Sequence, residues 1–259
     1  MTPRETTPPA NVQNVYRACW PVTPLRAQPT PLSEQVSQLL FGEALMVEQV
    51  QGVWHHVTGK WDGYSGWVPA AVLAPADCAE WPLRTLSHTT WLVGNERLHL
   101  PAGCRVPGRD FHWAARRWTL LDGQAGLPLA ASREAFVERC ASLLGLPYLW
   151  GGRSPYGCDC SGLMQWAAGL MDLPLRRDAW QQAEQLPSVD WGAQQAGDLA
   201  FFANASGRVT HVGVLETPGT IIHAVGSSAV RRDELTAEGI YNLELKKITH
   251  TLYRVAHIL

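Results

Sequence analysis

Several features that mark particular classes of protein are missing from this chain of 259 residues. It has no run approaching the ~20 apolar residues that a membrane-spanning helix needs. Its net charge of −2 gives no strongly basic surface of the kind that binds nucleic acid or an anionic membrane. Its first ten residues lack the apolar segment of a secretory signal. We therefore expect a cytoplasmic protein that binds neither nucleic acid nor membrane.

Cysteines are few and scattered, which argues against a disulfide framework. In a reducing compartment we expect them to be free thiols. The six are Cys19, Cys78, Cys104, Cys140, Cys158 and Cys160. Cys158 and Cys160 have a spacing that metal sites use, but no second Cys or His pair at finger-like spacing accompanies them. We expect no metal and no other cofactor, and the sequence implies no obligate protein partner.

The composition is that of an ordinary globular protein, with 46% apolar and 17% charged residues. Residues 1–12 are rich in Pro and Thr and predict a loose tail. Between 13 and 76, short apolar runs separated by Gly and Asp turns predict an all-β domain, with a long Pro-rich connection at 21–31. Residues 77–128 predict a second small all-β domain. In 129–259, helical patterns come first and strand patterns follow, which predicts an α+β domain.

A Gly/Pro-rich loop in the last domain runs into Asp159-Cys160-Ser161-Gly162, and an apolar stretch with helical spacing follows as far as about residue 171. This pattern places Cys160 at the start of a helix. The first backbone N–H groups of a helix have no partner within it, and the helix dipole is positive there. Both effects favour the thiolate, which is the nucleophilic form of cysteine. The pattern therefore predicts that Cys160 is reactive.

A cysteine nucleophile needs a base, and two histidines lie in strand-like surroundings downstream. His211 and His223 flank a Pro-Gly turn signal at 218–219. If the two strands form a hairpin centred on residue 217, the histidines lie directly opposite each other on one face, with Cβ atoms roughly 5 Å apart. One imidazole then acts as the base and the other orients it.

The remaining patterns of the last domain support the α+β prediction. Ser132 and Gly145 are typical of the two ends of a helix, and Asp178 is typical of the start of a short helix at 177–184. Strands are predicted at 198–202, 209–215, 220–225, 229–232 and 251–258.

Five motifs in this order resemble those of the NlpC/P60 family of papain-like cysteine peptidases. They are Pro147-Tyr148-Leu-Trp-Gly-Gly, Asp159-Cys-Ser-Gly-Leu, Ala196-Gly-Asp-Leu-Ala-Phe-Phe, His211-Val-Gly-Val and Ile222-His-Ala. The resemblance implies that Cys160 is the nucleophile, His211 the base and His223 the third, polar residue. It also implies action on bacterial cell-wall stem peptides, between D-Glu, through its γ-carboxyl, and a diamino acid.

The resemblance also suggests residues that contact the substrate. Tyr148 resembles the family's active-site tyrosine, and Trp150 and Asp178 are further candidates. Asp159 and Ser161 are similar to residues of the substrate pocket in recycling enzymes of the family, where they would bind the free amine of the peptide. Capping of the helix by Asp159 is an equally good interpretation.

Three N-terminal features resemble a bacterial SH3-like domain, whose long loop would be 21–37: Gln38-Leu-Leu-Phe-Gly-Glu43, Trp54 and Asp62-Gly-Tyr-Ser-Gly-Trp-Val68. The layout is similar to recycling enzymes that carry two such domains before a papain-like NlpC/P60 domain. In these enzymes the first domain contacts L-Ala, which makes Glu34 and Tyr64 candidates, with Glu43 as the alternative acid. The resemblance implies a γ-D-glutamyl-L-diamino acid endopeptidase acting on peptides with a free N-terminal L-Ala. The alternatives are an N-acetylmuramoyl-L-alanine amidase-type hydrolase and a non-catalytic protein that binds wall peptides.

Overall fold

The computed structural model describes residues 15–76, 80–226 and 228–259. The predicted tail at 1–12 and Cys78 lie outside the described residues. The chain divides into two compact units, Met1–Pro128 and Leu129–Leu259.

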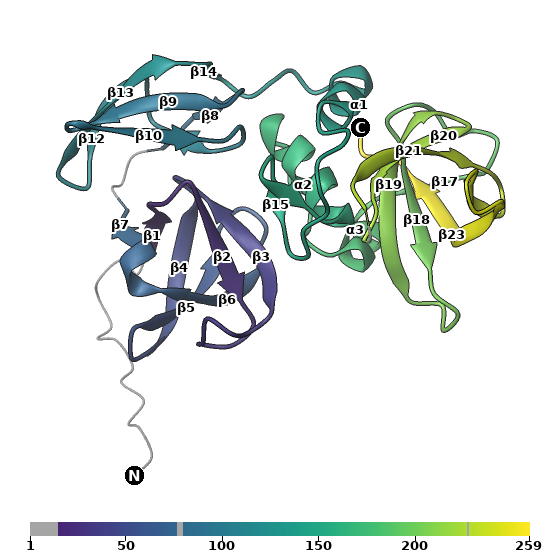
Figure 1. Cartoon of the computed structure of the whole chain (residues 1–259), viewed down its shortest axis with the longest axis horizontal. Coiled ribbons are helices and arrows are strands. Elements are labelled where there is room, and N and C mark those ends of the chain that lie inside the picture. Colours follow the sequence, from purple (N-terminus) through teal and green to yellow (C-terminus); the bar gives the residue numbers. More distant parts are fainter. Residues whose placement is uncertain (1–14, 77–79, 227) are drawn as a thin grey trace, which may run out of the picture. The chain divides into compact units, whose positions relative to one another are not determined.

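The first unit begins with a seven-stranded antiparallel sheet in the order β3-β2-β6-β5-β4-β1-β7 (Figure 1). A single 3-10 turn, η1 (Ala70–Val72), precedes the last strand. Alternate side chains point into one apolar core, as the two-residue period of a strand requires. The strands are β1 (Val15–Ala18), β2 (Val22–Arg26), β3 (Gln35–Leu40), β4 (Ala44–Gln51), β5 (Trp54–Gly59), β6 (Ser65–Pro69) and β7 (Leu73–Pro75).

The long loop predicted at 21–37 is wrong in part, because β2 and the start of β3 lie within it. The prolines of this segment favoured a loop, since a proline cannot donate a hydrogen bond to a neighbouring strand. Along most of its length β2 pairs only with β3, and a single residue pair joins it to β6. A strand bonded mainly on one side tolerates Pro24, and the fully buried Leu25 holds β2 against the core.

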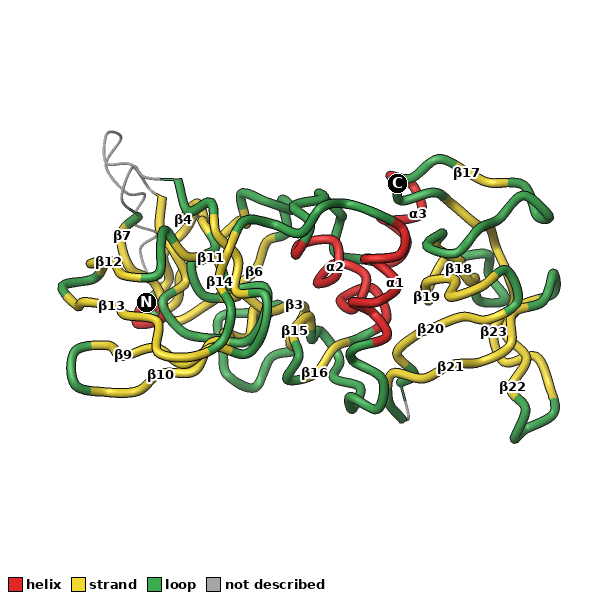
Figure 2. Tube along the Cα trace, turned by 90° about the horizontal axis from the view of Figure 1, so that it is seen from above, coloured by secondary structure: helices red, strands yellow, loops and turns green. Residues whose placement is uncertain are grey.

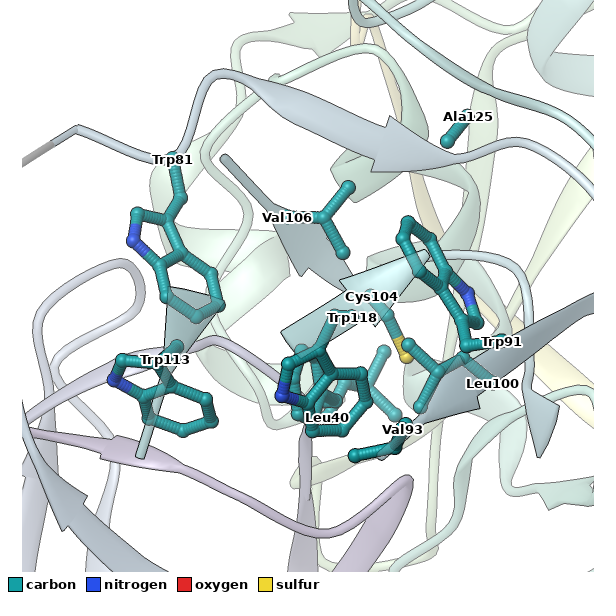
Figure 3. Packing of buried hydrophobic residues seen from close by; sticks show 11 residues of the cluster. Leu40, Trp81, Trp91, Val93, Leu100, Cys104, Val106, Trp113, Trp118 and Ala125 are labelled. Atoms are coloured by element: carbon teal, nitrogen blue, oxygen red, sulfur yellow. The ribbon is translucent and has the colours of Figure 1, made fainter. Parts of the chain in front are cut away.

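The rest of the first unit consists of a four-stranded sheet, β10-β9-β13-β12, and a three-stranded sheet, β11-β8-β14. The strands are β8 (Leu83–Thr85), β9 (Thr89–Val93), β10 (Glu96–Leu100), β11 (Arg105–Val106), β12 (Asp110–Trp113), β13 (Arg116–Asp122) and β14 (Ala125–Gly126). Their shared core is rich in indoles, as the close-up of Trp81, Trp91, Trp113 and Trp118 shows (Figure 3).

Phe41, from the turn after β3, belongs to this same core. Its ring centroid lies 5.9 Å from that of Trp81, 5.4 Å from that of Trp113 and 4.6 Å from that of Trp118. The two β parts of the first unit therefore share buried aromatic surface. That the second part is an SH3-like domain of its own stays a prediction.

The second unit contains α1 (Arg133–Ala141), α2 (Cys160–Leu170) and α3 (Ala179–Gln185). Their N-cap residues are Ser132, Asp159 and Asp178, as the sequence predicts. A short hairpin of β15 (Arg153–Ser154) and β16 (Gly157–Cys158) precedes α2. None of the described helices is long and apolar enough to cross a membrane.

Six antiparallel strands of the second unit close into a barrel, because β23 pairs with both β18 and β22. The short β17 (Ser188–Val189) adds to β23 from outside this ring. The three helices lie together on one side of the barrel in both views (Figures 1 and 2). The six strands are β18 (Leu199–Ala203), β19 (Val209–Thr217), β20 (Thr220–Ala224), β21 (Val230–Leu235), β22 (Gly239–Asn242) and β23 (Lys247–Ala256).

Candidate active site

Cys160 is the first residue of α2 and follows the β15–β16 hairpin. The chain just before this hairpin passes so close to the helix that a Cβ at Gly162 would collide with the carbonyl oxygen of Gly152. The thiol is 7% exposed and lies beside the backbone N–H groups of Ser161 and Val212. Since Val212 follows His211 on β19, this contact places the thiol beside the strand that carries the predicted base.

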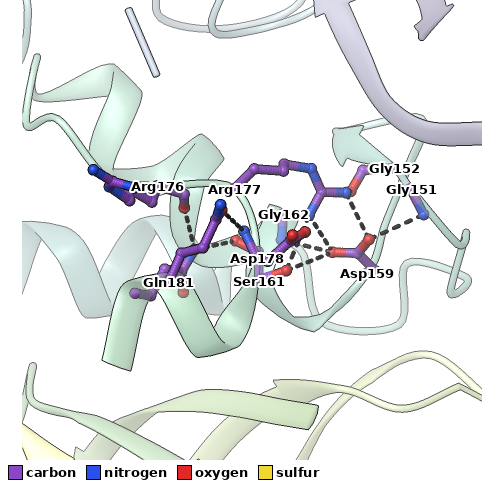
Figure 4. A network of polar contacts seen from close by, with 10 residues as sticks. Gly151, Gly152, Asp159, Ser161, Gly162, Arg176, Arg177, Asp178 and Gln181 are labelled. Atoms are coloured by element: carbon purple, nitrogen blue, oxygen red, sulfur yellow. Dashed lines mark hydrogen bonds and ion pairs between the residues drawn. The ribbon is translucent and has the colours of Figure 1, made fainter. Parts of the chain in front are cut away.

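A buried ion pair fixes the turn before the nucleophile (Figure 4). The Asp159 carboxylate accepts hydrogen bonds from the backbone N–H of Gly162 at 2.7 Å and from that of Gly151 at 3.0 Å. Arg177 donates to both of its oxygens, at 3.0 and 2.6 Å, and also to Ser161 Oγ at 2.9 Å. With its charge already paired, Asp159 fits the capping interpretation better than the amine-binding one. Ser161 is likewise buried in this network.

The two predicted histidines are joined inside the barrel. His211 Nε2 lies 2.8 Å from His223 Nδ1, and the rings are nearly perpendicular. On the far side of His223, its Nε2 lies 3.0 Å from Asp233 Oδ2. The three side chains come from the adjacent strands β19, β20 and β21 and are all more than nine-tenths buried. The structure therefore extends the predicted histidine pair by one carboxylate.

The predicted register of the histidine hairpin is wrong by two residues. The strands pair Val214 with Ile222, so that Gly213, rather than His211, lies opposite His223. The turn pairs Thr217 with Thr220, so the hairpin is centred beyond residue 217, and the bulge between Leu215 and Thr217 removes only one residue of the resulting offset. A shift of two residues keeps side chains on the same face, since strands alternate with a period of two. His211 and His223 are therefore diagonal neighbours instead of direct ones, and their rings still meet.

His250, on β23, completes the polar end of the barrel. Its ring stacks on that of His211 with centroids 4.4 Å apart and lies edge-on to that of His223 at 6.0 Å. Phe202 contacts His211 and His250 at the boundary with the apolar core of the barrel. These neighbours bury the faces of the His211 imidazole and restrict its rotation.

Burial determines the protonation states of the pair. It raises the pKa of Cys160 to about 12, and the Asp159 carboxylate adds to this effect, against the lowering influence of the Val212 and Ser161 N–H groups. Burial also lowers the pKa of His211 well below its ordinary value, with further lowering from His223 and His250. The predicted preference for thiolate is therefore reversed in this structure, because loss of solvation outweighs the helix N-terminus. Both shifts favour the neutral forms, a thiol at Cys160 and a neutral imidazole at His211.

The other predicted substrate contacts of this unit differ in exposure. Tyr148 is partly buried, and burial together with Cys160 and Asp159 raises the pKa of its hydroxyl, which places it near the nucleophile. Trp150 is 61% exposed. Asp178 is the N-cap residue of α3, and its backbone N–H donates to Gln181 Oε1 at 3.0 Å.

The remaining candidates belong to the first unit. Glu34 is exposed, and Tyr64 packs partly against the core of the seven-stranded sheet. Glu43 is buried, and its carboxylate accepts a hydrogen bond from the backbone N–H of Leu40 at 3.0 Å. This bond ties Glu43 to the turn after β3 and leaves Glu34 the more accessible acid. The substrate contacts of Glu34 and Tyr64 stay predictions.

Comparison with known proteins gives two family matches, to the NlpC/P60 family at residues 145–248 and to the bacterial dipeptidyl-peptidase SH3 domain at residues 25–73. A probable endopeptidase of Corynebacterium glutamicum is 39% identical over 173 residues, which cover 61% of this chain and 79% of that protein. The chain belongs to the NlpC/P60 family. NlpC/P60 proteins are cysteine peptidases that act as peptidoglycan endopeptidases. The NlpC/P60 match includes Cys160, His211, His223 and Asp233 but ends before His250.

Two further NlpC/P60 relatives extend over more of the chain. A gamma-D-glutamyl-L-lysine dipeptidyl-peptidase of Bacillus cereus is 26% identical over 222 residues, covering 73% of this chain and 66% of that protein. The crystal structure of an NlpC/P60 family protein from Bacillus cereus superposes with a TM-score of 0.80 at 18% identity, covering 95% of this chain and 99% of that one. The second likeness establishes the shared fold.

Arg177, Asp233 and His250 were not predicted as site residues. Asp233 had a detectable signal, since it directly follows the strand predicted at 229–232. Extending the period-two argument from His223 to this next strand brings Asp233 to the same face. Arg177 and His250 had no signal of this kind, because their contacts come from segments far apart in the sequence.

Proposed function

We propose that the protein is a cysteine endopeptidase that cuts between the γ-carboxyl of D-Glu and a diamino acid in peptidoglycan stem peptides with a free N-terminal L-Ala. The observation that carries this proposal is the Cys160–His211–His223 arrangement in a chain that also matches the SH3 domain of bacterial dipeptidyl-peptidases. The likeness to the Bacillus cereus dipeptidyl-peptidase supports it. The aligned segment covers 73% of this chain, which is longer than either unit, so the likeness includes parts of both units.

The first chemical step forms a thioester. The Cys160 thiol gives its proton to His211 while its sulfur attacks the γ-carbonyl carbon of D-Glu, so the neutral pair becomes ionic only during the reaction. The carbonyl electrons move to oxygen, and the backbone N–H of Cys160, with the Tyr148 hydroxyl, is the candidate donor set for that oxyanion. When the intermediate collapses, the C–N bond breaks and His211 returns the proton to the departing amine.

The second step hydrolyses the thioester. A water molecule gives a proton to His211 as its oxygen attacks the same carbonyl carbon. Collapse breaks the C–S bond, and the proton returns to the sulfur of Cys160. The products are the L-Ala-γ-D-Glu dipeptide and the free diamino acid. His223 holds the other nitrogen of His211 throughout, which fixes the ring angle.

Recognition of the free amine would restrict the enzyme to turnover peptides in the cytoplasm. Wall precursors carry the same peptide, but their L-Ala nitrogen is blocked by the lactyl amide of muramic acid. An acid that must pair with an ammonium group rejects the blocked peptide, since an unpaired charge removed from water costs several kcal/mol. Because Arg177 already neutralises Asp159, Glu34, Tyr64 and Asp178 are the better candidates for this contact.

The test compares L-Ala-γ-D-Glu-diamino acid with the same peptide acetylated at its N-terminus, following release of the diamino acid. We expect cleavage of the free peptide only, and none by the Cys160→Ala variant. Cleavage of both peptides would retain the endopeptidase and discard amine recognition. Cleavage of neither would contradict the proposal. A parallel incubation with an N-acetylmuramoyl peptide then separates an amidase from a non-catalytic binding protein.

A further inference from the structure

Asp233 has no part in the two steps above, yet it is built into the same hydrogen-bond chain. Its carboxylate is 6% exposed and belongs to the polar end of the barrel. Oδ2 lies 3.0 Å from His223 Nε2, while Oδ1 accepts a hydrogen bond from Arg231 at 2.8 Å. A buried carboxylate is costly unless both oxygens are paired, and here each oxygen has a separate donor. Arg231 therefore holds the carboxylate with one oxygen directed at His223.

The charge of Asp233 determines which way the hydrogen bonds run. Burial alone would raise the pKa of Asp233, but the hydrogen bond from His223 and the paired Arg231 guanidinium act against it, and that pKa is lowered. An ionised carboxylate can only accept a hydrogen bond. His223 must therefore carry a proton on Nε2, and whenever the ring is neutral its Nδ1 is an acceptor. The nitrogen that faces this acceptor, His211 Nε2, must then carry a proton and donate it.

The consequence reaches the nucleophile. A neutral imidazole has one protonated and one unprotonated nitrogen. With the proton of His211 on Nε2, its Nδ1 is unprotonated and able to take the proton of Cys160. If His223 carried its proton on Nδ1 instead, His211 Nε2 would become the acceptor. The proton of His211 would then lie on Nδ1, and the ring could not act as a base toward the thiol.

We propose that Asp233 is a positioning residue whose buried carboxylate, acting through His223, fixes the direction of this hydrogen-bond chain and so keeps Nδ1 of His211 unprotonated. The proposal rests on the cysteine-peptidase chemistry proposed above, but it does not depend on which peptide is the substrate. Asp233 touches no reacting atom, and its effect on the reaction passes through two imidazole rings.

The direct test is the protonation of the histidine rings in the unmodified protein. Nitrogen-15 NMR of a histidine-labelled sample above pH 7 distinguishes protonated from unprotonated ring nitrogens, with signals assigned from single histidine variants. We expect both His211 and His223 to be protonated at Nε2. A proton on Nδ1 of His211 would overturn the proposal. This measurement needs neither a substrate nor a stable Asp233 variant.

The second test is the variant Asp233→Asn, which keeps the shape but can donate a hydrogen bond to His223. We expect its ring tautomers to redistribute and its kcat on the tripeptide to fall on the order of 10- to 100-fold, by analogy with the carboxylates that orient metal-bound histidines. KM should stay within about threefold, because Asp233 does not contact the peptide. Glu234→Gln is the matched control, since it removes an exposed carboxylate from the next position of β21. Unchanged tautomers and kcat in Asp233→Asn would refute the role.

A double variant separates positioning from an independent contribution. If Asp233 acts only through His223, adding Asp233→Asn to His223→Ala should cost no further activity. If the activity losses of the two single variants multiply in the double variant, the mechanism is contradicted. Failure of the unmodified protein to cleave the tripeptide would remove the proposed substrate only, since the NMR measurement still decides the role of Asp233.

Discussion

Replacing Gly213 by alanine tests how closely the position of His223 is controlled. A Cβ at Gly213 would lie 2.8 Å from the Cβ of His223 and 2.7 Å from Cδ1 of Ile221. Ordinary van der Waals contact begins at 3.4 Å, so His223 or β19 must move by about 0.6 Å in a barrel packed to native density. Moving His223 away from β19 by this amount lengthens its 2.8 Å hydrogen bond to His211 toward the limit of a real bond.

The size of the effect follows from that displacement. A misplacement of ~1 Å in a catalytic group costs roughly 100-fold, so about tenfold in kcat is expected for Gly213→Ala. Crowding of the barrel interior should also lower the free energy of unfolding by about 1–3 kcal/mol. Both are measurable, by hydrolysis of the tripeptide and by thermal unfolding. KM should change little, because Gly213 is buried against Ile221 and His223.

Gly219→Ala is the matched control for this variant. Gly219 lies in the turn of the same hairpin, and a Cβ there would meet nothing within 4 Å. It should keep its activity and stability, so that a loss specific to Gly213→Ala reflects the contact with His223. A Gly213→Ala enzyme with the kcat of the unmodified protein would show that the reasoning about His223 is wrong.

Four further changes have defined outcomes. Cys160→Ala should abolish turnover while leaving the thermal unfolding temperature nearly unchanged; substantial residual activity would exclude it as the nucleophile. Arg177→Met should destabilise the protein by ~3–5 kcal/mol in denaturant titrations, because it leaves the buried charge of Asp159 without its cation, whereas the exposed Arg176→Met should have little effect. Since burial raises the pKa of Cys160 to about 12, its alkylation rate should keep rising with pH through pH 9, and a plateau near neutral pH would instead indicate a preformed ion pair. Phe41→Ala should cost ~3–5 kcal/mol, and an equally stable variant would show that its aromatic contacts contribute little.

Local patterns in the sequence predicted much of the second unit. Helix starts at Ser132, Asp159 and Asp178 were correct, because an N-cap side chain bonds to a backbone N–H only two or three residues away. The strands carrying the two histidines were also found. The short β22 was missed because four residues, the first of them a glycine, carry too little alternation to distinguish a strand from a turn.

The errors arose where the outcome depends on distant parts of the chain. The hairpin register failed because the turn pairs Thr217 with Thr220 and is not centred on residue 217, and the alternation of apolar residues does not determine that centre. The expected thiolate failed because a helix N-terminus is a local feature, whereas the burial of Cys160 requires α2 to pack against β19. Asp159 could not be assigned from sequence, since its partner Arg177 lies 18 residues away in an irregular segment.

The barrel uses the alternation of its strands for two purposes. Inward-facing positions of the same strands supply apolar side chains such as Leu215 and Ile221 at one end and the ionisable chain of His211, His223 and Asp233 at the other. The apolar end keeps water out of the barrel interior. This strengthens the hydrogen bonds between the buried polar groups and makes a polar group without a partner costly. Each of the three ionisable side chains must then have a hydrogen-bond partner inside the barrel. For the last histidine that partner is a carboxylate, and a carboxylate permits only one direction of donation. On this view the closed barrel that stabilises the fold also selects the tautomer of His211.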